Sequence, residues 1–287
     1  MLAIYKKELR NYFTSMVGYV FIAFSLVIIG ISFYNKNLIN RIANFEFTIN
    51  DVTTIFILLA PILTMRLMAE EKRQKTDQLL LTAPLKASDI VVGKFLAVFT
   101  VLLTVMAIVS TYPLILNIYG KVPFASAYAS IFGFCMLGGA YLSIGQFVSS
   151  LTESQVVAAV TTFVIFIITS LIDGLAAVVP ADGKTSYIVF TVIILAISLV
   201  LYQMMQKLFV AIGVGVIAEL SLTIAYFVKP EAFDGLVAKF FGWISVLSRF
   251  SNFRLGILDF TSMIYYLSIM FLFLFLTVQV VKKKRWS

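Results

Sequence analysis

The charged side chains of this sequence gather in one block, and their spacing favours ion pairs along a helix. Residues 70–94 read EEKRQKTDQLLLTAPLKASDIVVGK. Glu71 stands four residues before Lys75, and Glu70 stands three residues before Arg73. On a helix both pairs face each other in the order that stabilises it. We therefore expect a solvated helix in the first part of this block.

Two further carboxylates lie within apolar runs, where ionised groups are costly and usually functional. Glu219 lies in the middle of GVGVIAELSLTIAYF, and Asp173 lies in the outer third of the run that contains ITSLIDGLAAVV. Glu219 either stays neutral and hydrogen-bonded to a neighbouring helix or lines a polar path, and we favour packing, against a helix or a partner subunit. We expect Asp173 to shape the outer end of such a path together with Gly174.

Composition excludes several kinds of chemistry. The sequence contains no histidine, which removes histidine-based catalysis, histidine-ligated zinc or haem, and histidine proton relays. The single cysteine, Cys135, lies in an apolar run and is expected to act as a small hydrophobe. The phosphate-binding motif G-x-x-x-x-G-K-[ST] is missing, because Val178 stands where the first glycine before Gly183-Lys184-Thr185 would be. We expect no catalytic residue, no metal site and no cofactor bound by this chain.

Charge is rare elsewhere, and apolar residues dominate. Of the 287 residues, 61% are hydrophobic and 13% are charged, and the mean hydropathy is +1.01. Apolar runs near the ~20 residues needed to cross a bilayer recur along the whole length, so we expect one all-α transmembrane domain over residues 1–287. The net charge of +8 comes from basic residues at the ends of these runs, which indicates membrane orientation rather than nucleic-acid binding.

Eight apolar runs are candidate transmembrane helices. The runs at 186–206 and 208–228 are joined by the tight connection QMMQK, so a re-entrant pair, and a total of six spans, is the alternative. Both counts place the two termini on the same side of the membrane. The first run is Met16–Tyr34, and the others lie at about 51–69, 92–118, 126–149, 155–179, 186–206, 208–228 and 262–281.

The basic residues set the predicted orientation. With the N-terminus inside, 14 of the 22 lysines and arginines fall in cytoplasmic segments. Of the remaining 8, four lie in residues 229–261, which also contain Glu231, Asp234 and Asp259. We therefore expect both termini to be cytoplasmic.

Two segments are predicted to lie along the membrane surface. Residues 1–13 form an amphipathic helix with a polar face of lysine, arginine and asparagine. Its apolar face consists of Leu2, Tyr5, Leu9, Tyr12 and Phe13. Residues 229–261 are too charged to span the membrane but rich in aromatic residues, so we expect short amphipathic or re-entrant helices on the outer face. A lid of loops is the alternative.

The connection between the second and third runs reads as a helix, a stop and a second helix. The leucines at 79–81 form an apolar strip that a simple connection does not require, and Pro84 ends the first helix. Ser88 is expected to cap the next helix, and Lys94 to lie at its membrane boundary. An apolar strip rimmed by charge is typical of a docking site. The alternative is a solvated connection whose leucines rest on the bilayer.

This stretch resembles a known family. MRLMAEEKRQKTDQLLLTAPLKASDIVVGK is similar to the cytoplasmic signature of ABC-2 type permeases, although Lys75-Thr76 replaces the Gly-Thr of many members. KKELRNYF resembles the family's elbow helix, SSLTESQVVA its second cytoplasmic turn and KKKRWS its C-terminal tail. Within the family the chain resembles the gliding-motility-associated permeases and the permease for nitrous-oxide-reductase maturation. The resemblance covers most of the chain except about 184–230, where this sequence carries two additional apolar runs.

The resemblance implies a permease subunit of an ATP-binding cassette transporter, an exporter in a bacterial cytoplasmic membrane that is not itself an enzyme. Two copies of a separate ATPase would bind ATP and Mg²⁺, and a second permease chain, identical or different, would pair with this one. An accessory membrane protein with an extracytoplasmic domain would contact 229–261. Residues 70–92 would contain the coupling helix that docks on the ATPase. The implied coupling residues are Glu70, Glu71, Arg73, Thr76, Leu79, Leu80, Leu81 and Pro84, supported by Arg66 and Lys94.

Two other functions stay open on the residues alone. An ion-coupled secondary transporter would use Glu219 and Asp173 for protons or cations, and it would be expected to show inverted repeats, of which the sequence gives no convincing example. A non-transporting membrane scaffold of a biogenesis complex is the other. Stimulated ATPase activity in a reconstituted complex distinguishes all three functions.

Overall fold

The computed structural model describes residues 1–76, 85–178, 180, 182–205 and 208–286. Within these residues every regular element is a helix. The chain divides into two compact units, Met1–Ile168 with Arg249–Ser287, and Thr169–Ser248. Helix α9 (Gln155–Val178) begins in the first unit and ends in the second.

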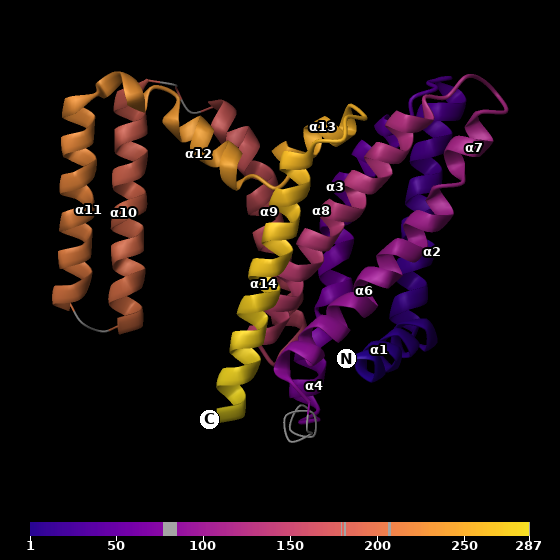
Figure 1. The fold of residues 1–287 in the computed structure, drawn as a ribbon, viewed down its shortest axis with the longest axis horizontal. Helices are drawn as coiled ribbons and strands as arrows, with labels where there is room; N and C mark the ends of the chain where they lie inside the picture. The colour runs from indigo at the N-terminus through magenta and orange to yellow at the C-terminus, as the bar shows by residue number, and fades with distance from the viewer. Residues whose placement is uncertain (77–84, 179, 181, 206–207, 287) are drawn as a thin grey trace. The chain divides into compact units, whose positions relative to one another are not determined.

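The first unit is a bundle of apolar helices built around α8 (Figure 1). Helix α8 packs against α3, α4, α6 and α14. Of the most apolar stretch of α8, 78% is buried, whereas 28% of the corresponding stretch that contains α2 is buried. Helix α8 is therefore the core of this unit, and α2 turns most of its surface to the surroundings. The helices are α1 (Leu2–Thr14), α2 (Met16–Phe33), α3 (Glu46–Thr64), α4 (Arg66–Arg73), α6 (Ala87–Val109), α7 (Tyr112–Leu116), α8 (Phe124–Leu151), α13 (Ser251–Arg254) and α14 (Phe260–Trp286), with a π-helical turn η1 (Tyr34–Ile39).

Small residues let α8 approach its neighbours closely. A Cβ atom added at Gly133 would lie 2.3 Å from the Phe253 ring, and one added at Gly145 would lie 2.3 Å from the Thr64 hydroxyl oxygen. Neither space can hold a methyl group without a shift of the neighbouring side chain. Membrane helices depend on this kind of close contact, because lipid provides little hydrophobic drive for their association.

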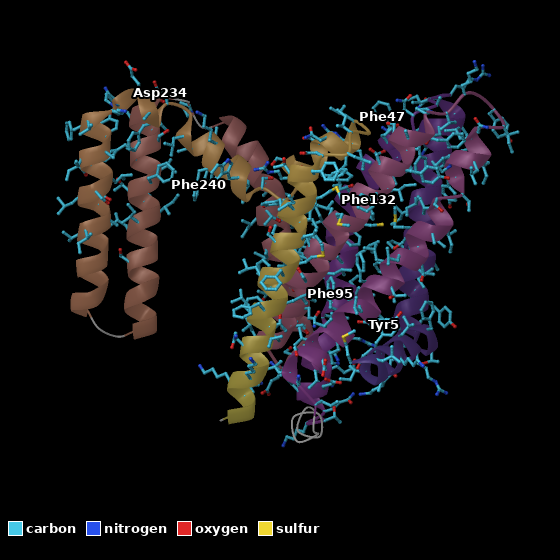
Figure 2. All side chains as sticks on the ribbon, viewed as in Figure 1. Tyr5, Phe47, Phe95, Phe132, Asp234 and Phe240 are labelled. Carbon is cyan, nitrogen blue, oxygen red and sulfur yellow. The ribbon has the colours of Figure 1, made fainter. Side chains whose placement is uncertain are left out.

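The second unit contains a helical hairpin and a short helix. Helices α10 (Gly183–Met205) and α11 (Leu208–Val228) pack side by side, as Figure 1 shows. The turn η2 (Pro230–Phe233) and helix α12 (Leu236–Ile244) follow, and η3 (Ser248–Phe250) begins at the last residue of the unit. Figure 2 labels Phe240, the residue of α12 whose ring centroid lies 5.4 Å from that of Phe190 on α10. This edge-to-face contact fixes α12 on the hairpin.

Six helices of the described residues are long and apolar enough to cross a membrane. This number agrees with the lower of the two predicted counts. The hairpin helices α10 and α11 have 23 and 21 residues, but their described apolar stretches are shorter, at Gly183–Leu195 and Gly215–Val228. The six spans are Met16–Ile39, Glu46–Arg73, Ala87–Leu116, Phe124–Leu151, Gln155–Ile172 and Phe260–Lys284.

Two local predictions for the charged block are wrong. Helix α4 ends at Arg73, and Lys75 has a left-handed backbone (φ 57°), so Glu71 and Lys75 do not form the expected pair along a helix. Helix α6 begins at Ala87 after the extended residue Lys86, which places Ser88 inside the first turn instead of at the cap. Leu79, Leu80, Leu81 and Pro84 lie outside the described residues.

Asp259 organises the start of α14. Its carboxylate accepts hydrogen bonds from the Thr261 backbone N–H at 2.9 Å, the Ser262 hydroxyl at 2.7 Å and the Asn252 amide at 3.0 Å. The bonds from Ser262 and Asn252 lower the pKa of Asp259 to about 2. A carboxylate in this position suits the positive end of the helix dipole, so α14 begins at a defined residue.

The close packing of α8 can be tested by adding a methyl group. We expect Gly145→Ala to lower stability by about 1–3 kcal/mol, because the new Cβ atom overlaps Thr64. Gly30→Ala on α2 is the matched control, since no atom lies within 4 Å of a Cβ atom there. Thermal unfolding of both variants in the same detergent measures the difference. Equal midpoints for the two variants would contradict this packing.

Candidate functional site

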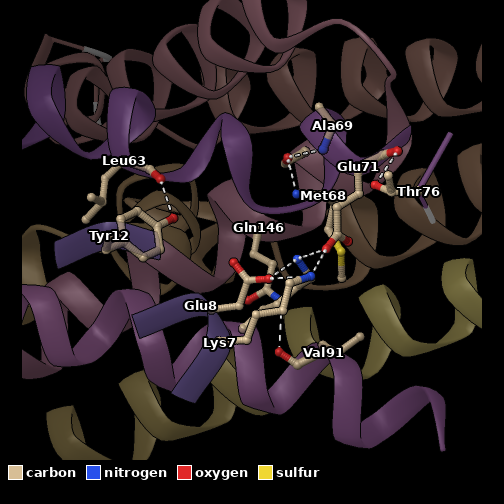
Figure 3. A network of polar contacts seen from close by, with 12 residues as sticks. Lys7, Glu8, Tyr12, Leu63, Met68, Ala69, Glu71, Thr76, Val91 and Gln146 are labelled. Carbon is tan, nitrogen blue, oxygen red and sulfur yellow. Dashed lines mark hydrogen bonds and ion pairs between the residues drawn. The ribbon is translucent and has the colours of Figure 1, made fainter. Parts of the chain in front are cut away.

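Helix α4 is anchored to the core helix by one serine. The Ser149 hydroxyl on α8 accepts hydrogen bonds from the backbone N–H groups of Met68 and Ala69, both at 3.1 Å (Figure 3). It donates to the Met65 carbonyl at 3.0 Å. Met68 and Ala69 are buried. These bonds satisfy backbone groups at the join between α3 and α4, where the helical ladder is interrupted. The position of α4 is thus set by α8.

A buried lysine joins three helices below this anchor. The Lys94 ammonium on α6 lies 2.9 Å from a Glu71 carboxylate oxygen on α4 and 3.0 Å from a Glu8 carboxylate oxygen on α1. The Lys94 side chain is 1% exposed. Lys7 lies 3.6 Å from Glu71 and 3.9 Å from Glu8 but is 57% exposed, so solvent screens its contribution. We call Glu8, Glu71 and Lys94 the ion cluster.

The ion cluster constrains the fold because none of its members can be removed alone without leaving buried charge. Burial of an ammonium group is unfavourable unless opposite charges and hydrogen bonds surround it. Lys94 satisfies this requirement with carboxylates from two different helices, α1 and α4. The three helices therefore have one arrangement in which the charges are paired.

Further hydrogen bonds surround the ion cluster and connect its helices to α3 and α8. The Gln146 amide on α8 donates to the Val91 carbonyl on α6 at 2.9 Å, and Lys72 donates to the Ser150 carbonyl. The Tyr12 hydroxyl on α1 donates to the Leu63 carbonyl on α3 at 3.1 Å. Burial, with smaller effects of nearby carboxylates, raises the pKa of Tyr12 well above its ordinary value, so the phenol stays protonated and keeps this bond.

Of four residues predicted for coupling or for its support, Glu70, Glu71, Arg66 and Lys94, two form an ion pair with each other and two do not. Glu71 and Lys94 form the shortest ion pair of the described chain. Arg66 and Glu70 form no ion pair with a described residue, and the buried Nε atom of Arg66 has no hydrogen-bond partner there. Glu70 accepts a 3.4 Å hydrogen bond from Gln74. Both Arg66 and Glu70 line a cavity of about 440 Å³.

The remaining predicted coupling residues lie at the end of α4 or beyond it. Arg73 is the last residue of the helix and is exposed. Thr76 bonds back to the Glu71 carbonyl through its backbone N–H at 3.0 Å and its hydroxyl at 3.4 Å. The last described residue before the gap at 77–84 is therefore tied to the residue that carries the ion pair.

Sequence reasoning missed Glu8. The buried face of α1 consists of Ile4, Glu8 and Tyr12, and Leu2 of the predicted apolar face is exposed. Glu8 is the only acidic residue among residues 1–45, which was the available signal. The structure explains this isolated carboxylate, because Glu8 forms an ion pair with the buried Lys94.

The predicted membrane carboxylates lie in other elements. Glu219 on α11 accepts hydrogen bonds at the same oxygen from Thr191 at 2.8 Å and Tyr187 at 3.3 Å, both on α10. Asp173 lies in α9, and its side chain is outside the described part. Among the described residues, no group of three or more acidic or cysteine side chains is placed to hold a metal ion.

The ion cluster predicts a large difference between two lysines. Lys94→Met leaves the Glu8 and Glu71 carboxylates close together without their buried partner, and we expect it to cost about 3–5 kcal/mol of stability. Lys7→Met, the control at an exposed site, should cost less than about 1 kcal/mol. Chemical or thermal unfolding in detergent measures both.

A second set of variants separates charge from packing. Lys94→Met combined with Glu8→Gln and Glu71→Gln removes the uncompensated carboxylates, so it should recover part of the lost stability. If the triple variant is no more stable than Lys94→Met alone, the electrostatic account of the ion cluster is wrong.

Comparison with known proteins identifies the family of this chain. A family model described as ABC-2 family transporter protein matches residues 2–205, which run from α1 to the end of α10. No curated protein matches the chain. The match covers the ion cluster, the anchor of α4 and five of the six candidate spans. The chain is therefore a multi-pass membrane protein that belongs to the ABC-2 family of transporter proteins.

Proposed function

We propose that this chain is the permease subunit of an exporter that couples ATP hydrolysis by separate ATPase subunits to the translocation of a substrate. The single observation that carries the proposal is the ion cluster, because it fixes both ends of the connection between α4 and α6. Glu71 lies at the entry to this connection and Lys94 lies beyond its exit, and their side chains are 2.9 Å apart. A force applied to the connection would reach both helices together.

The route of that force follows the packed elements. Helix α4 is bonded to α8 through Ser149, and α6 is bonded to α8 through Gln146. Helix α8 in turn packs against α14 and α3 along the bundle. Closure of two ATPase subunits would displace the adjoining ends of α4 and α6, and α8 would transmit the displacement toward the other end of the unit.

The proposed partners follow from the division between a membrane-spanning chain and a separate ATPase. The sequence has no G-x-x-x-x-G-K-[ST] motif, so two copies of a separate ATPase would bind ATP and Mg²⁺. A second permease chain, identical or different, would complete the path. An accessory membrane protein with an extracytoplasmic domain would contact residues 229–261. We place the complex in a bacterial cytoplasmic membrane with both termini in the cytoplasm, in the branch of gliding-motility-associated and nitrous-oxide-reductase-maturation permeases.

Docking of the ATPase is predicted to depend on the leucine strip. Replacement of Leu79, Leu80 and Leu81 by alanine should reduce co-purification of the ATPase at least about tenfold, because each lost leucine side chain removes about 1.5–3 kcal/mol of apolar burial. Co-purification from membranes that contain the tagged chain, followed by ATPase assay of the reconstituted complex, measures the effect.

A triple variant elsewhere is the control for this experiment. Leu255, Ile257 and Leu258 are also exposed apolar residues, and their replacement by alanine should leave ATPase binding unchanged. Unchanged assembly of the leucine-strip variant, or equal losses in both triple variants, would argue against docking at residues 79–81.

Glu219 gives a test against ion-coupled transport. Glu219→Gln keeps the oxygen that accepts the Thr191 and Tyr187 hydrogen bonds but cannot exchange a proton. We expect this variant to retain assembly and stimulated ATPase activity, whereas Glu219→Leu should weaken the hairpin by about 1–3 kcal/mol, since two donors lose their acceptor. Complete loss of transport in Glu219→Gln with intact assembly would favour the ion-coupled alternative.

A further inference from the structure

A polar cavity of about 440 Å³ opens beside the ion cluster, between α1, the start of α2 and α4. Its size falls within the range of about 300–1,000 Å³ that small-molecule sites occupy. Uncharged residues at the foot of α2, such as Ser15 and Val17, complete the wall. The charged side chains that line it are Lys7, Glu8, Arg66, Glu70, Glu71 and Lys94.

The charges of the cavity divide into a paired group and an unpaired one. Lys94 binds Glu8 and Glu71, and Lys7 adds weaker contacts with both. Arg66 and Glu70 remain, and they form no ion pair with each other or with another described residue, although they stand one turn apart on α4.

Arg66 is the lining residue that most directly indicates a ligand. Its Nε atom is buried and has no hydrogen-bond partner among the described residues. A buried donor of this kind is normally satisfied by protein, water or a ligand. Glu70 is partly buried and receives only the long bond from Gln74, at 3.4 Å. A cationic donor and an anionic acceptor therefore face one cavity, and each has room for a partner of opposite charge.

The surroundings of the cavity are those of a membrane surface. Ser15 separates α1 from α2, the first candidate span, so the cavity lies at the foot of that span. Between the lining residues Ser15 and Val17, the apolar side chain of Met16 is 81% exposed. Exposed apolar side chains at the end of a span contact lipid, and the adjacent polar cavity is then at the level of the lipid headgroups.

We propose that this cavity binds the headgroup of a zwitterionic phospholipid that carries a primary ammonium group, with the phosphate on Arg66 and the ammonium on Glu70. Guanidinium groups bind phosphate oxygens through paired hydrogen bonds, and an ammonium group donates up to three hydrogen bonds to carboxylates. A phosphatidylglycerol headgroup would leave Glu70 without a cation. A choline headgroup has no N–H to donate. Phosphatidylethanolamine satisfies both side chains, and its acyl chains would lie along the exposed residues of α2.

Lipid retention by the full chain tests this proposal. The chain is reconstituted with equal amounts of phosphatidylethanolamine, phosphatidylglycerol and phosphatidylcholine, extracted into mild detergent, and analysed for retained lipid by native mass spectrometry. We expect wild type to retain phosphatidylethanolamine about tenfold over the other two, since one charge-assisted hydrogen bond distinguishes the lipids. Glu70→Gln should abolish this preference and leave phosphatidylglycerol retention unchanged, while Arg66→Gln should lower the retention of all three.

The controls separate the cavity from general lipid binding. Glu153→Gln removes an exposed carboxylate from the other predicted cytoplasmic turn and should leave the preference unchanged. Free phosphoethanolamine should displace the retained lipid from wild type more effectively than glycerol phosphate, and this comparison decides the proposal even if Glu70→Gln does not fold. Equal retention of the three lipids by wild type, or a preference that neither Glu70→Gln nor phosphoethanolamine reduces, would overturn the proposal.

Discussion

The arrangement of the first unit depends on how a single buried ammonium group is neutralised. Lys94 lies 86 residues from Glu8 and 23 residues from Glu71 in the sequence, and its ammonium group contacts both carboxylates within 3.0 Å. Because an unpaired charge at this depth is very unfavourable, α1 and α4 must both reach α6 before the bundle is complete. Because of this requirement, α1 packs against the helix bundle instead of lying separately on the membrane surface.

Helix α8 holds the helices of the first unit together through close packing and hydrogen bonds. Close approach to α3 and α13 requires the missing side chains at Gly145 and Gly133, and Ser149 and Gln146 on the same helix hold α4 and α6. Close packing against α3 and α13 and hydrogen bonding to α4 and α6 therefore both hold this one helix. A helix that is held so continuously transmits a displacement instead of absorbing it, which is the property that a coupling element needs.

The sequence predicted the features that depend on periodic or apolar patterns. It did not predict the contacts between residues that are distant in the sequence. Long apolar runs predicted eight spans, with six as the alternative, and the described residues have six candidate spans. The charged block carried the resemblance to the family and drew attention to Glu71 and Lys94. The Glu71–Lys75 pair was a local rule, worth only a few tenths of a kcal/mol on a helix, and it lost to the buried pairing with Lys94. Glu8 was missed because its partner is distant in sequence. Ser88 was misplaced because the extended Lys86 occupies the cap position two residues earlier.

The two adjacent glutamates of α4 have different interactions, although they look alike in the sequence. Glu71 forms an ion pair with Lys94 on α6, while Glu70 and Arg66, which line the same cavity, form no ion pair with a described residue. Consecutive residues on a helix point about 100° apart, so the two adjacent carboxylates have different surroundings. One carboxylate compensates a buried ammonium group, and the other faces the ligand that we propose for the cavity. Two adjacent glutamates thus allow one carboxylate to pair with Lys94 without using the other.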